Sequence, residues 1–359
     1  MLWPLLRASL FRFDPESVHH FAHVALHAVP VAFSRWRRPA APASLAVQCL
    51  GRRFESPLGL AAGFDKGDVS VAGLFGMGFS HVEVGTITPR PQAGNERPRV
   101  FRLPEHRALI NRMGFNNAGA EVCANRLAAL PAAARMGPVG INVGKNKDTP
   151  NERAVEDYLA CIDRLHPYAD YMVVNISSPN TPGLRQLQAR DALDGLLRAC
   201  VARLREKSPG TALLVKLAPD LELEALDEAV DVAVAAGVGG IVATNTTLSR
   251  AGVESHRRAT EAGGLSGAPL TARAREVVRR VARRAAGRVP VIGSGGVMGA
   301  EEVYGLIRAG ATLVQAYTGF IYGGPGFASR ANRELARMLA RDGFKTVSEA
   351  VGADLRAAP

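Results

Sequence analysis

The chain has 359 residues, of which 47% are hydrophobic, and it contains 37 glycines. This composition excludes a disordered or fibrous chain, and the length allows one large domain or two ordinary ones. Lysine and arginine outnumber the acidic residues by 44 to 33, which gives a net charge of +11. Such a balance suits an anionic substrate or an anionic membrane surface. The basic residues form no run of five or more, which argues against a nucleic-acid-binding tail.

The first 40 residues predict a pair of short amphipathic helices. Residues 2–13 form the first, and Asp14 begins a second that ends at Pro30. Trp3, Trp36 and several arginines at the edges are typical of helices that lie in a membrane interface. A helical hairpin packed on the rest of the protein is the other interpretation. The apolar face of the second helix contains Val18, Phe21, Ala22, Ala25 and Val29.

The chain has four cysteines. Cys49, Cys123, Cys161 and Cys200 are far apart and have no metal-ligand spacing, so we expect reduced thiols on the cytoplasmic side and no metal site. No run of 18 apolar residues occurs, so no transmembrane helix is expected. The N-terminus also lacks the features of a signal peptide.

From residue 58 onward, short apolar runs alternate with helical patterns. The predicted strands are 58–62, 81–86, 139–143, 171–176, 212–217, 240–244, 290–293 and 312–316. The predicted helices are 67–76, 117–130, 150–165, 190–207, 221–236, 270–286, 299–309 and 326–341, and the third should begin with Thr149 and Glu152 as a capping box. Eight strands alternating with eight helices predict a parallel (β/α)8 barrel. A doubly wound sheet is the alternative, but its GxGxxG loop is missing.

Polar or glycine-rich segments follow the predicted strands. In a (β/α)8 barrel the carboxyl ends of the strands form one face, where ligands bind. The segment "NISSPNTPGLR" (175–185) is the richest in amides and hydroxyls, and "GSGGV" (293–297) and "GGLSG" (263–267) have the composition of a phosphate cradle. The pattern therefore predicts a binding pocket that holds a phosphorylated cofactor.

Two lysines and several asparagines indicate what the pocket binds. Lys216 lies within an apolar strand, so it either pairs with a carboxylate or faces an anionic ligand such as a reduced flavin. Lys66 follows Asp65, which is a candidate counter-charge. The many asparagines suit a heterocycle with N–H and C=O edges. No Ser-His-Asp set is apparent, so Ser178 is a candidate proton acceptor, with Thr181 as a relay partner, and not an acyl-transfer nucleophile.

Longer motifs resemble one family over most of the chain. They are "SPLGLAAGFDK", "GTITPRPQAGNERPR", "LINRMGFNNAG", "NVGKNKDT", "NISSPNTPGLR", "KLAPD", "ATNTT", "GGLSG" and "AYTGFIYGGP". In sequence and order these motifs resemble the membrane-linked, quinone-dependent (class 2) dihydroorotate dehydrogenases. The resemblance implies a barrel that holds FMN and oxidises (S)-dihydroorotate to orotate in pyrimidine (UMP) synthesis.

The resemblance also implies a role for each matching residue. Ser178 would be the base for the C5 proton while hydride passes from C6 to flavin N5. The substrate would be bound by Lys66, Asn111, Arg112, Met113, Gly114, Phe115, Asn175, Asn180, Asn245 and Thr246. FMN would be bound by Ala62, Gly63, Phe64, Asp65, Lys66, Thr86, Asn142, Asn175, Lys216, Thr244, Gly267, Gly296, Tyr317 and Thr318.

Ser178 and the N-terminal helices are the markers of class 2, since soluble relatives use cysteine as the base. We therefore expect residues 1–40 to form the quinone and membrane access, 41–342 the barrel and 343–359 an uncommitted extension. The resemblance implies a peripheral protein on the cytoplasmic side of the cell membrane, a ubiquinone or menaquinone acceptor, and a monomer. The alternatives are a soluble FMN barrel that uses NAD or fumarate, and a non-enzymatic basic membrane-binding protein.

Overall fold

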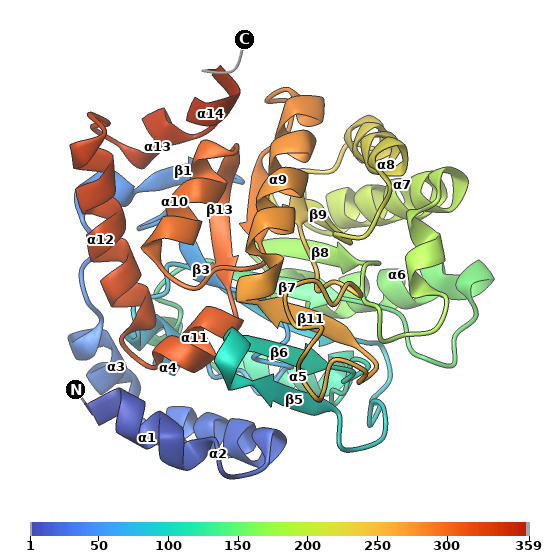
Figure 1. The fold of residues 1–359 in the computed structure, drawn as a ribbon. Coiled ribbons are helices and arrows are strands. Elements are labelled where there is room, and N and C mark those ends of the chain that lie inside the picture. Colours follow the sequence, from blue (N-terminus) through green and yellow to red (C-terminus); the bar gives the residue numbers. More distant parts are fainter. Residues whose placement is uncertain (1, 357–359) are drawn as a thin grey trace.

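The computed structural model describes residues 2–356 and has a closed barrel of eight parallel strands at its centre (Figure 1). All eight predicted strands are present, each ending within two residues of its expected limits. This confirms the (β/α)8 barrel and excludes the doubly wound sheet. The barrel strands are β3 (Leu58–Leu60), β4 (Val82–Ile87), β7 (Val139–Val143), β8 (Tyr171–Asn175), β9 (Ala212–Leu217), β10 (Gly240–Ala243), β12 (Val291–Ser294) and β13 (Ala311–Ala316).

Helices surround the barrel and bury one apolar face each against it. In α9 (Thr271–Ala285) the buried residues Ala274, Val277, Val278 and Val281 follow the spacing of one helix face, and six arginines lie at other positions. The other helices of the ring are α4 (Val71–Gly76), α5 (Ala120–Ala128), α6 (Ala154–Leu165), α7 (Arg190–Lys207), α8 (Leu223–Ala235), α10 (Ala300–Arg308) and α12 (Phe327–Arg341). Every predicted helix is therefore present, and the largest differences lie at the N-terminal ends.

The start of α6 differs from the prediction. Thr149 makes no capping bond, Pro150 is extended, and a 3-10 turn at Asn151–Arg153 precedes the helix. The Asn151 side chain instead donates to the carbonyl oxygen of Gly183 at 2.9 Å. The predicted capping box is wrong because this segment is held by the loop after β8 and not by its own helix.

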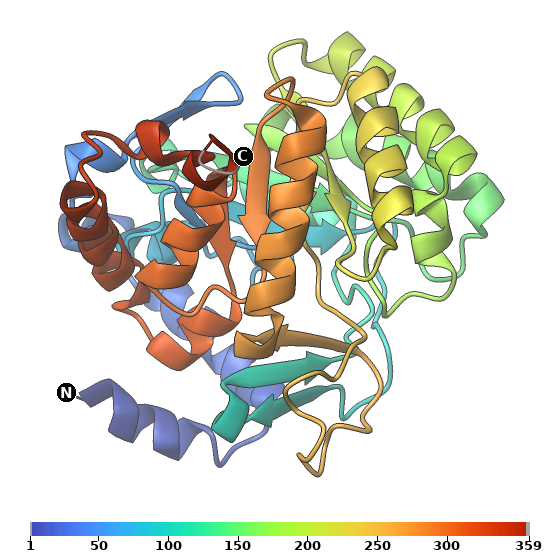
Figure 2. The same cartoon turned by 45° about the horizontal axis from the view of Figure 1, so that its top comes forward.

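A three-stranded antiparallel sheet that the sequence did not predict lies at the carboxyl end of the barrel (Figure 2). It is formed by β5 (Val100–Leu103), β6 (Ala108–Asn111) and β11 (Gly264–Gly267), with β6 in the middle. Strands β5 and β6 come from the loop after β4, and β11 comes from the loop after β10. The sheet therefore forms a wall over the face where a ligand is expected.

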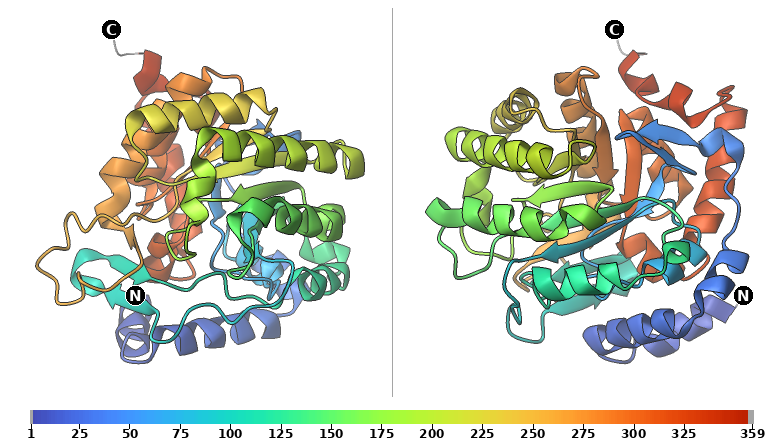
Figure 3. Two further views of the ribbon diagram at one scale, coloured as in Figure 1. Left: turned by 90° about the vertical axis from the view of Figure 1, so that its right-hand side faces the viewer. Right: turned by 180° about the vertical axis from the view of Figure 1, so that it is seen from behind.

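The N-terminal helices lie beside this sheet, at the same end of the barrel (Figure 3). Helices α1 (Leu2–Leu10) and α2 (Pro15–Ala28) match the prediction, and Asp14 caps α2 by accepting the N–H of Ser17 at 2.8 Å. A third helix, α3 (Val31–Arg37), was not expected. Buried His23 bonds the Ser70 hydroxyl at 2.8 Å, and its other nitrogen lies 3.0 Å from the Phe64 carbonyl oxygen, so α2 is fastened to the barrel.

The opposite end of the barrel is covered by the hairpin of β1 (Val47–Cys49) and β2 (Arg52–Phe54) and by the C-terminal segment, so the two chain ends lie far apart (Figure 1). The expected uncommitted extension packs on the barrel as far as residue 356. Helix α13 (Val347–Ala350) buries two residues, and Asp354 in α14 (Ala353–Arg356) pairs with Arg308 at 2.7 Å. No helix within residues 2–356 has the length and apolar character needed to span a bilayer.

Candidate active site

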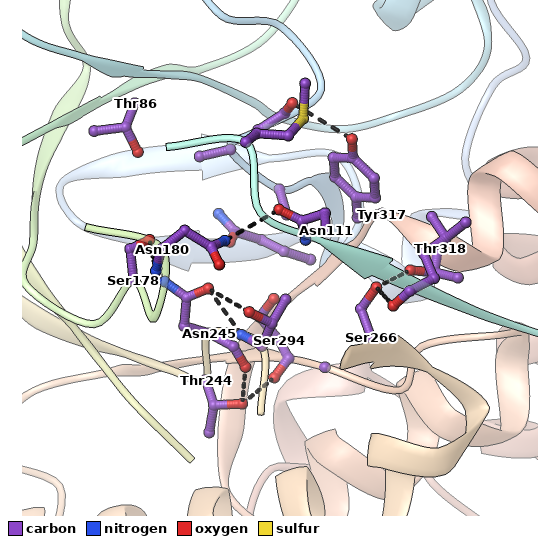
Figure 4. Close-up of a pocket in the computed structure, with 18 of the residues that line it drawn as sticks. Thr86, Asn111, Ser178, Asn180, Thr244, Asn245, Ser266, Ser294, Tyr317 and Thr318 are labelled. Atoms are coloured by element: carbon purple, nitrogen blue, oxygen red, sulfur yellow. Dashed lines mark hydrogen bonds between the residues drawn. The ribbon is translucent and has the colours of Figure 1, made fainter. Parts of the chain in front are cut away.

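A cavity of about 150 Å³ opens at the carboxyl ends of the barrel strands (Figure 4). Most of the residues expected to bind ligands line it. They are Ala62, Gly63, Lys66, Thr86, Asn111, Met113, Gly114, Phe115, Asn175, Ser178, Asn180, Lys216, Thr244, Asn245, Thr246, Gly267, Gly296, Tyr317 and Thr318. The polar clusters that follow the strands in sequence thus meet in one place.

Two residues expected in the pocket have side chains that serve the structure around it. Arg112 does not line the cavity, because its guanidinium pairs with Glu261 at 2.8 Å and stacks on Phe101 at 4.6 Å from the ring centre. Buried Asp65 accepts three backbone N–H groups of the following loop, from Gly67, Val69 and Ser70, and does not neutralise Lys66.

Two other expected residues lie on either side of the cavity. Asn142 is fully buried beneath it and accepts the Thr86 hydroxyl at 2.6 Å. Phe64 faces a second, apolar cavity against the N-terminal helices. Neither side chain lines the first cavity, but each contacts a residue that does: Asn142 contacts Thr86, and Phe64 contacts Tyr317.

Ser178 lies in the loop after β8 and is only 5% exposed. Its hydroxyl oxygen accepts the backbone N–H of Asn180 at 3.2 Å, which fixes its position. Within residues 2–356 no bond joins it to the proposed relay partner Thr181, nor to any carboxylate or imidazole. Ser178 therefore faces the cavity with its own O–H still available to a ligand (Figure 4).

The two lysines differ in their surroundings. Lys216, on β9, is buried and lines the cavity, and no carboxylate of residues 2–356 lies within ion-pair distance of it. Burial lowers its pKa, and the carboxylate of Glu83 opposes that shift. Partly exposed Lys66 donates to the side-chain oxygen of Asn116 at 2.9 Å, and burial together with Arg99 lowers its pKa to about 7. Of the two interpretations of Lys216, pairing with a carboxylate or facing an anionic ligand, the structure therefore favours the second.

Asparagine side chains contact one another around the cavity. Asn180 donates to Asn111 at 3.3 Å (Figure 4). Asn245 donates to Asn175 at 3.4 Å and to Ser177 at 2.9 Å. The Oδ1 atom of Asn180 is buried with no partner in the described part of the chain. An acceptor left in this way fits a ligand that brings its own N–H.

Glycines line the other end of the cavity, where Ser266 and Thr318 bond to each other at 2.8 Å (Figure 4). Gly267 and Gly296 both have positive φ, and a Cβ at either would overlap neighbouring backbone atoms. Only glycine fits these positions, and both line the cavity, so backbone without side chains forms this part of the wall, from the end of β11 and from the loop after β12. This is the arrangement that backbone phosphate sites use.

Several residues of the site were not expected from the sequence. Leu109 comes from the unpredicted sheet, and Gln315 stands in the interior of the apolar strand β13. Buried Glu83, on β4, accepts the Gln315 amide at 2.6 Å beneath the cavity. For Gln315 and Glu83, the signal available in the sequence was a polar residue inside an apolar run, as it was for Lys216.

A second cavity of about 370 Å³ lies between the N-terminal helices and the barrel. Apart from Glu16, His19 and Arg102, no residue that lines it carries a charge or an imidazole. Burial lowers the pKa of His19 to about 3, so that ring is neutral. The two cavities share a wall made of Val100, Leu109, Met113 and Tyr317.

A polar cavity at the carboxyl ends of the strands of a (β/α)8 barrel is where enzymes of this fold have their active sites. The comparisons with known proteins name the family. Residues 44–339 match the family model described as dihydroorotate dehydrogenase. A crystal structure of DHODH from Eimeria tenella in complex with ferulenol superposes with a TM-score of 0.87 at 39% identity, covering 96% of each chain.

Similar full-length relatives carry the name dihydroorotate dehydrogenase (quinone). One, from Anaeromyxobacter dehalogenans (strain 2CP-C), is 75% identical over 99% of this chain and 98% of its own length. Another, from Myxococcus xanthus (strain DK1622), is 52% identical over the same shares. The chain belongs to the dihydroorotate dehydrogenase family, in its quinone-dependent class, and is an oxidoreductase.

Proposed function

We propose that the chain oxidises (S)-dihydroorotate to orotate with FMN as cofactor, in pyrimidine (UMP) synthesis, and passes the electrons to ubiquinone or menaquinone. The observation that carries the proposal is the pair of cavities, one polar and one apolar, that share a wall at the mouth of the barrel. A reaction with one polar and one lipophilic substrate needs two such spaces within reach of one cofactor.

The residues present fit FMN. The close backbone approach at Gly267 and Gly296 suits its phosphate, and the unpaired Lys216 ammonium suits the anionic edge of a reduced flavin. Buried acceptors without partners suit the N–H of the flavin ring. When bound, FMN would accept at N5 the hydride that leaves C6 of the substrate.

The chain's own residues would bind and deprotonate the substrate. Asn111, Asn180 and Asn245 offer amide groups to the dihydropyrimidine ring, and Lys66 offers an ammonium to its carboxylate. Ser178 would take the C5 proton. Because a serine hydroxyl is a weak base, it needs a site closed to water, and the 5% exposure of Ser178 supports that role.

The apolar cavity would receive the quinone. Its walls come from both sides, with Ala22 and Ala25 on α2 and Phe64 and Phe320 on the barrel. An apolar space of this size favours a hydrophobic ring over a charged nucleotide or a dicarboxylate. This argues for quinone and against NAD or fumarate as the acceptor.

The outer surface of the N-terminal helices supports peripheral attachment to the cytoplasmic side of the cell membrane. Seven of the nine exposed large hydrophobic residues of the described chain fall in residues 2–37, and Leu5 and Trp36 are 71% and 76% exposed. Apolar residues at this density, with arginines beside them, favour insertion at a lipid interface. We expect the protein to act there as a monomer.

Vesicle sedimentation tests the attachment. Replacing Phe33 and Trp36 together by serine should weaken binding to vesicles of anionic lipid at least tenfold, because both side chains are exposed on α3. Leu248→Ser, at an exposed position far along the chain, is the matched control and should bind as the wild type does. Equal binding of all three proteins would remove the membrane role from the helices.

An anaerobic titration tests the reductive half of the proposal. Adding (S)-dihydroorotate to the flavin-loaded protein should bleach the flavin absorbance, whereas the (R)-enantiomer should not. A protein that binds FMN but is not bleached by the (S)-enantiomer would rule out dihydroorotate as the substrate.

A further inference from the structure

Glu83 is a buried carboxylate that the proposed reaction does not use. It lies on β4 with no exposed surface, beneath the candidate active site. Its oxygens accept the side-chain amide of Asn142 at 2.8 Å, that of Gln315 at 2.6 Å and the Tyr171 hydroxyl at 3.4 Å. A buried charge that holds amides from two other strands of the barrel requires a reason.

Hydrogen bonds continue upward from Glu83 in one direction. The oxygen of Asn142 accepts the side-chain amide of Asn175 at 3.1 Å. The oxygen of Asn175 in turn accepts the Ser177 hydroxyl at 3.1 Å and the side-chain amide of Asn245 at 3.4 Å. We call Glu83, Asn142, Asn175 and Asn245 the amide ladder. Each amide in it donates toward Glu83, and the oxygens of Asn142 and Asn175 each accept from the amide above.

The direction at the base of the ladder follows from the chemistry of its lowest member. The oxygen and nitrogen ends of an asparagine side chain have nearly the same shape, so packing alone does not choose between them. A carboxylate only accepts, so Asn142 must turn its NH2 group toward Glu83 and its oxygen upward. Higher up, backbone groups reinforce the same direction: the Oδ1 of Asn175 also accepts the N–H of Ser177 at 3.3 Å, and the Oδ1 of Asn245 accepts the N–H of Thr246 at 2.8 Å.

The same carboxylate orients Gln315. Because the Gln315 NH2 group donates to Glu83, its Oε1 is left as an acceptor, buried and without a partner among residues 2–356. Gln315 lines the cavity. This acceptor is therefore available to an N–H of whatever ring lies at the bottom of the site.

We infer that Glu83 is a positioning residue that sets the hydrogen-bond direction of Asn142 and Gln315 at the base of the amide ladder, and thereby which donors and acceptors the bottom of the site offers to its heterocyclic ligands. The inference rests on the proposed function, in which Asn245 binds the substrate and FMN lies beside it. It assigns Glu83 no contact with the substrate.

Orotate binding to the oxidised, flavin-loaded protein tests the inference without turnover. Glu83→Gln keeps the shape but can donate as well as accept, so it no longer fixes the direction of Asn142 and Gln315. We expect the orotate Kd, read from the flavin absorbance shift, to rise about tenfold or more with the flavin retained. Tyr171→Phe removes the longest of the three bonds and none of the ladder, and should change Kd less than about twofold. An unchanged Kd in Glu83→Gln would overturn the inference.

A double variant tests whether the hydrogen-bond direction or the packing around Glu83 matters, and it keeps the inference testable if Glu83→Gln alone does not fold. Glu83→Gln with Gln315→Glu moves the carboxylate to the other side of the same hydrogen bond and leaves the new amide on β4 able to accept from Asn142. Recovery of most of the wild-type affinity is expected. A folded double variant that binds orotate as poorly as the single variant would contradict a directional role, and so would one that binds poorly when the single variant does not fold.

Repeating the Glu83→Gln measurement in a Lys216→Gln protein tests whether Glu83 acts by fixing hydrogen-bond direction or only by balancing the charge of Lys216. If Glu83 serves only to balance the Lys216 ammonium, Glu83→Gln should have no effect on orotate binding in a Lys216→Gln protein. If Glu83 instead fixes hydrogen-bond direction, Glu83→Gln should raise the orotate Kd by the same factor in the wild-type and the Lys216→Gln proteins. An orotate Kd that Glu83→Gln leaves unchanged in the Lys216→Gln protein would overturn the inference. A wild-type protein that does not bind orotate would instead count against the proposed function, so the two failures are distinct.

Discussion

The two cavities at the mouth of the barrel differ in almost every property except position. The candidate active site is built from strand ends, amides and two lysines, and the second cavity is built from apolar side chains of α1, α2 and the barrel surface. They share only the wall of Val100, Leu109, Met113 and Tyr317. A rigid barrel thus supplies the polar chemistry, and an added pair of helices supplies the lipophilic space.

Under the proposed function, this difference would keep two substrates of opposite polarity apart. The polar ligand would be held by hydrogen bonds from the strand ends, whereas the apolar cavity offers shape and little else. Changes on one side should therefore affect one half of the reaction and spare the other.

The largest effect is expected at the base. Ser178→Ala should retain FMN and orotate binding but slow flavin reduction by dihydroorotate by about 10²–10⁴-fold, because proton abstraction is lost. Stopped-flow absorbance measures that rate. Ser178→Cys should recover part of it, with a rate that rises with pH as the thiolate forms. Near-normal reduction in the alanine variant would remove Ser178 from the role of base.

A charge in the apolar cavity should damage only the other half of the reaction. Ala22→Glu on α2 would bury a carboxylate against Phe64 and its neighbours. The KM for a short-chain quinone should rise about tenfold or more, while bleaching by dihydroorotate stays normal. Val24→Glu on the same helix is the matched control, because Val24 is 53% exposed. An equal KM for quinone in the two variants would show that the quinone does not bind in this cavity.

Loss of the unpaired lysine should weaken flavin retention. Lys216→Ala removes the ammonium that lines the candidate active site, and we expect the FMN Kd to rise about tenfold. Equilibrium dialysis measures it. Lys207→Ala, at the exposed end of α7, is the control and should retain FMN normally. A flavin that is held and reduced as in the wild type would show that Lys216 does not serve FMN.

The smallest effect is a pH dependence of product binding. The pKa of Lys66 is lowered to about 7, so in the free protein its ammonium is mostly present at pH 6 and mostly absent at pH 8. If Lys66 binds the orotate carboxylate, affinity should fall several-fold as pH rises through 7, and binding should take up protons. Calorimetry in two buffers of different ionisation enthalpy measures this uptake. Lys66→Met should bind weakly and without that pH dependence, whereas a pH slope that survives in it would assign the titration elsewhere.

The barrel was predictable because its signal is repeated. Eight apolar runs such as 139–143 and 212–217 are buried on both faces, and their polar ends fall in phase, so the pocket residues could be found together. Irregular additions carry no such signal. Strands β5, β6 and β11 are four residues each and stand outside the strand–helix alternation, and the pairing of β6 with β11 joins segments far apart in the sequence.

Side-chain direction was the other limit of the sequence. Arg112 is next to pocket residues along the chain, yet Glu261 and Phe101 hold its side chain outside the cavity. The partnership of Glu83 with Gln315 spans 232 positions, and only the closed barrel brings them together. Sequence reasoning identified the polar residues at strand ends, and missed those whose partners lie across the barrel.

The oxidative half of the reaction tests the two-cavity account most directly. After anaerobic bleaching by dihydroorotate, the protein is mixed in separate cuvettes with a ubiquinone analogue, NAD and fumarate, and the return of flavin absorbance is followed. The account predicts rapid reoxidation by the quinone alone, and a loss of that step in Ala22→Glu but not in Val24→Glu. Recovery with NAD or fumarate, or equal reoxidation of both variants by quinone, would contradict it.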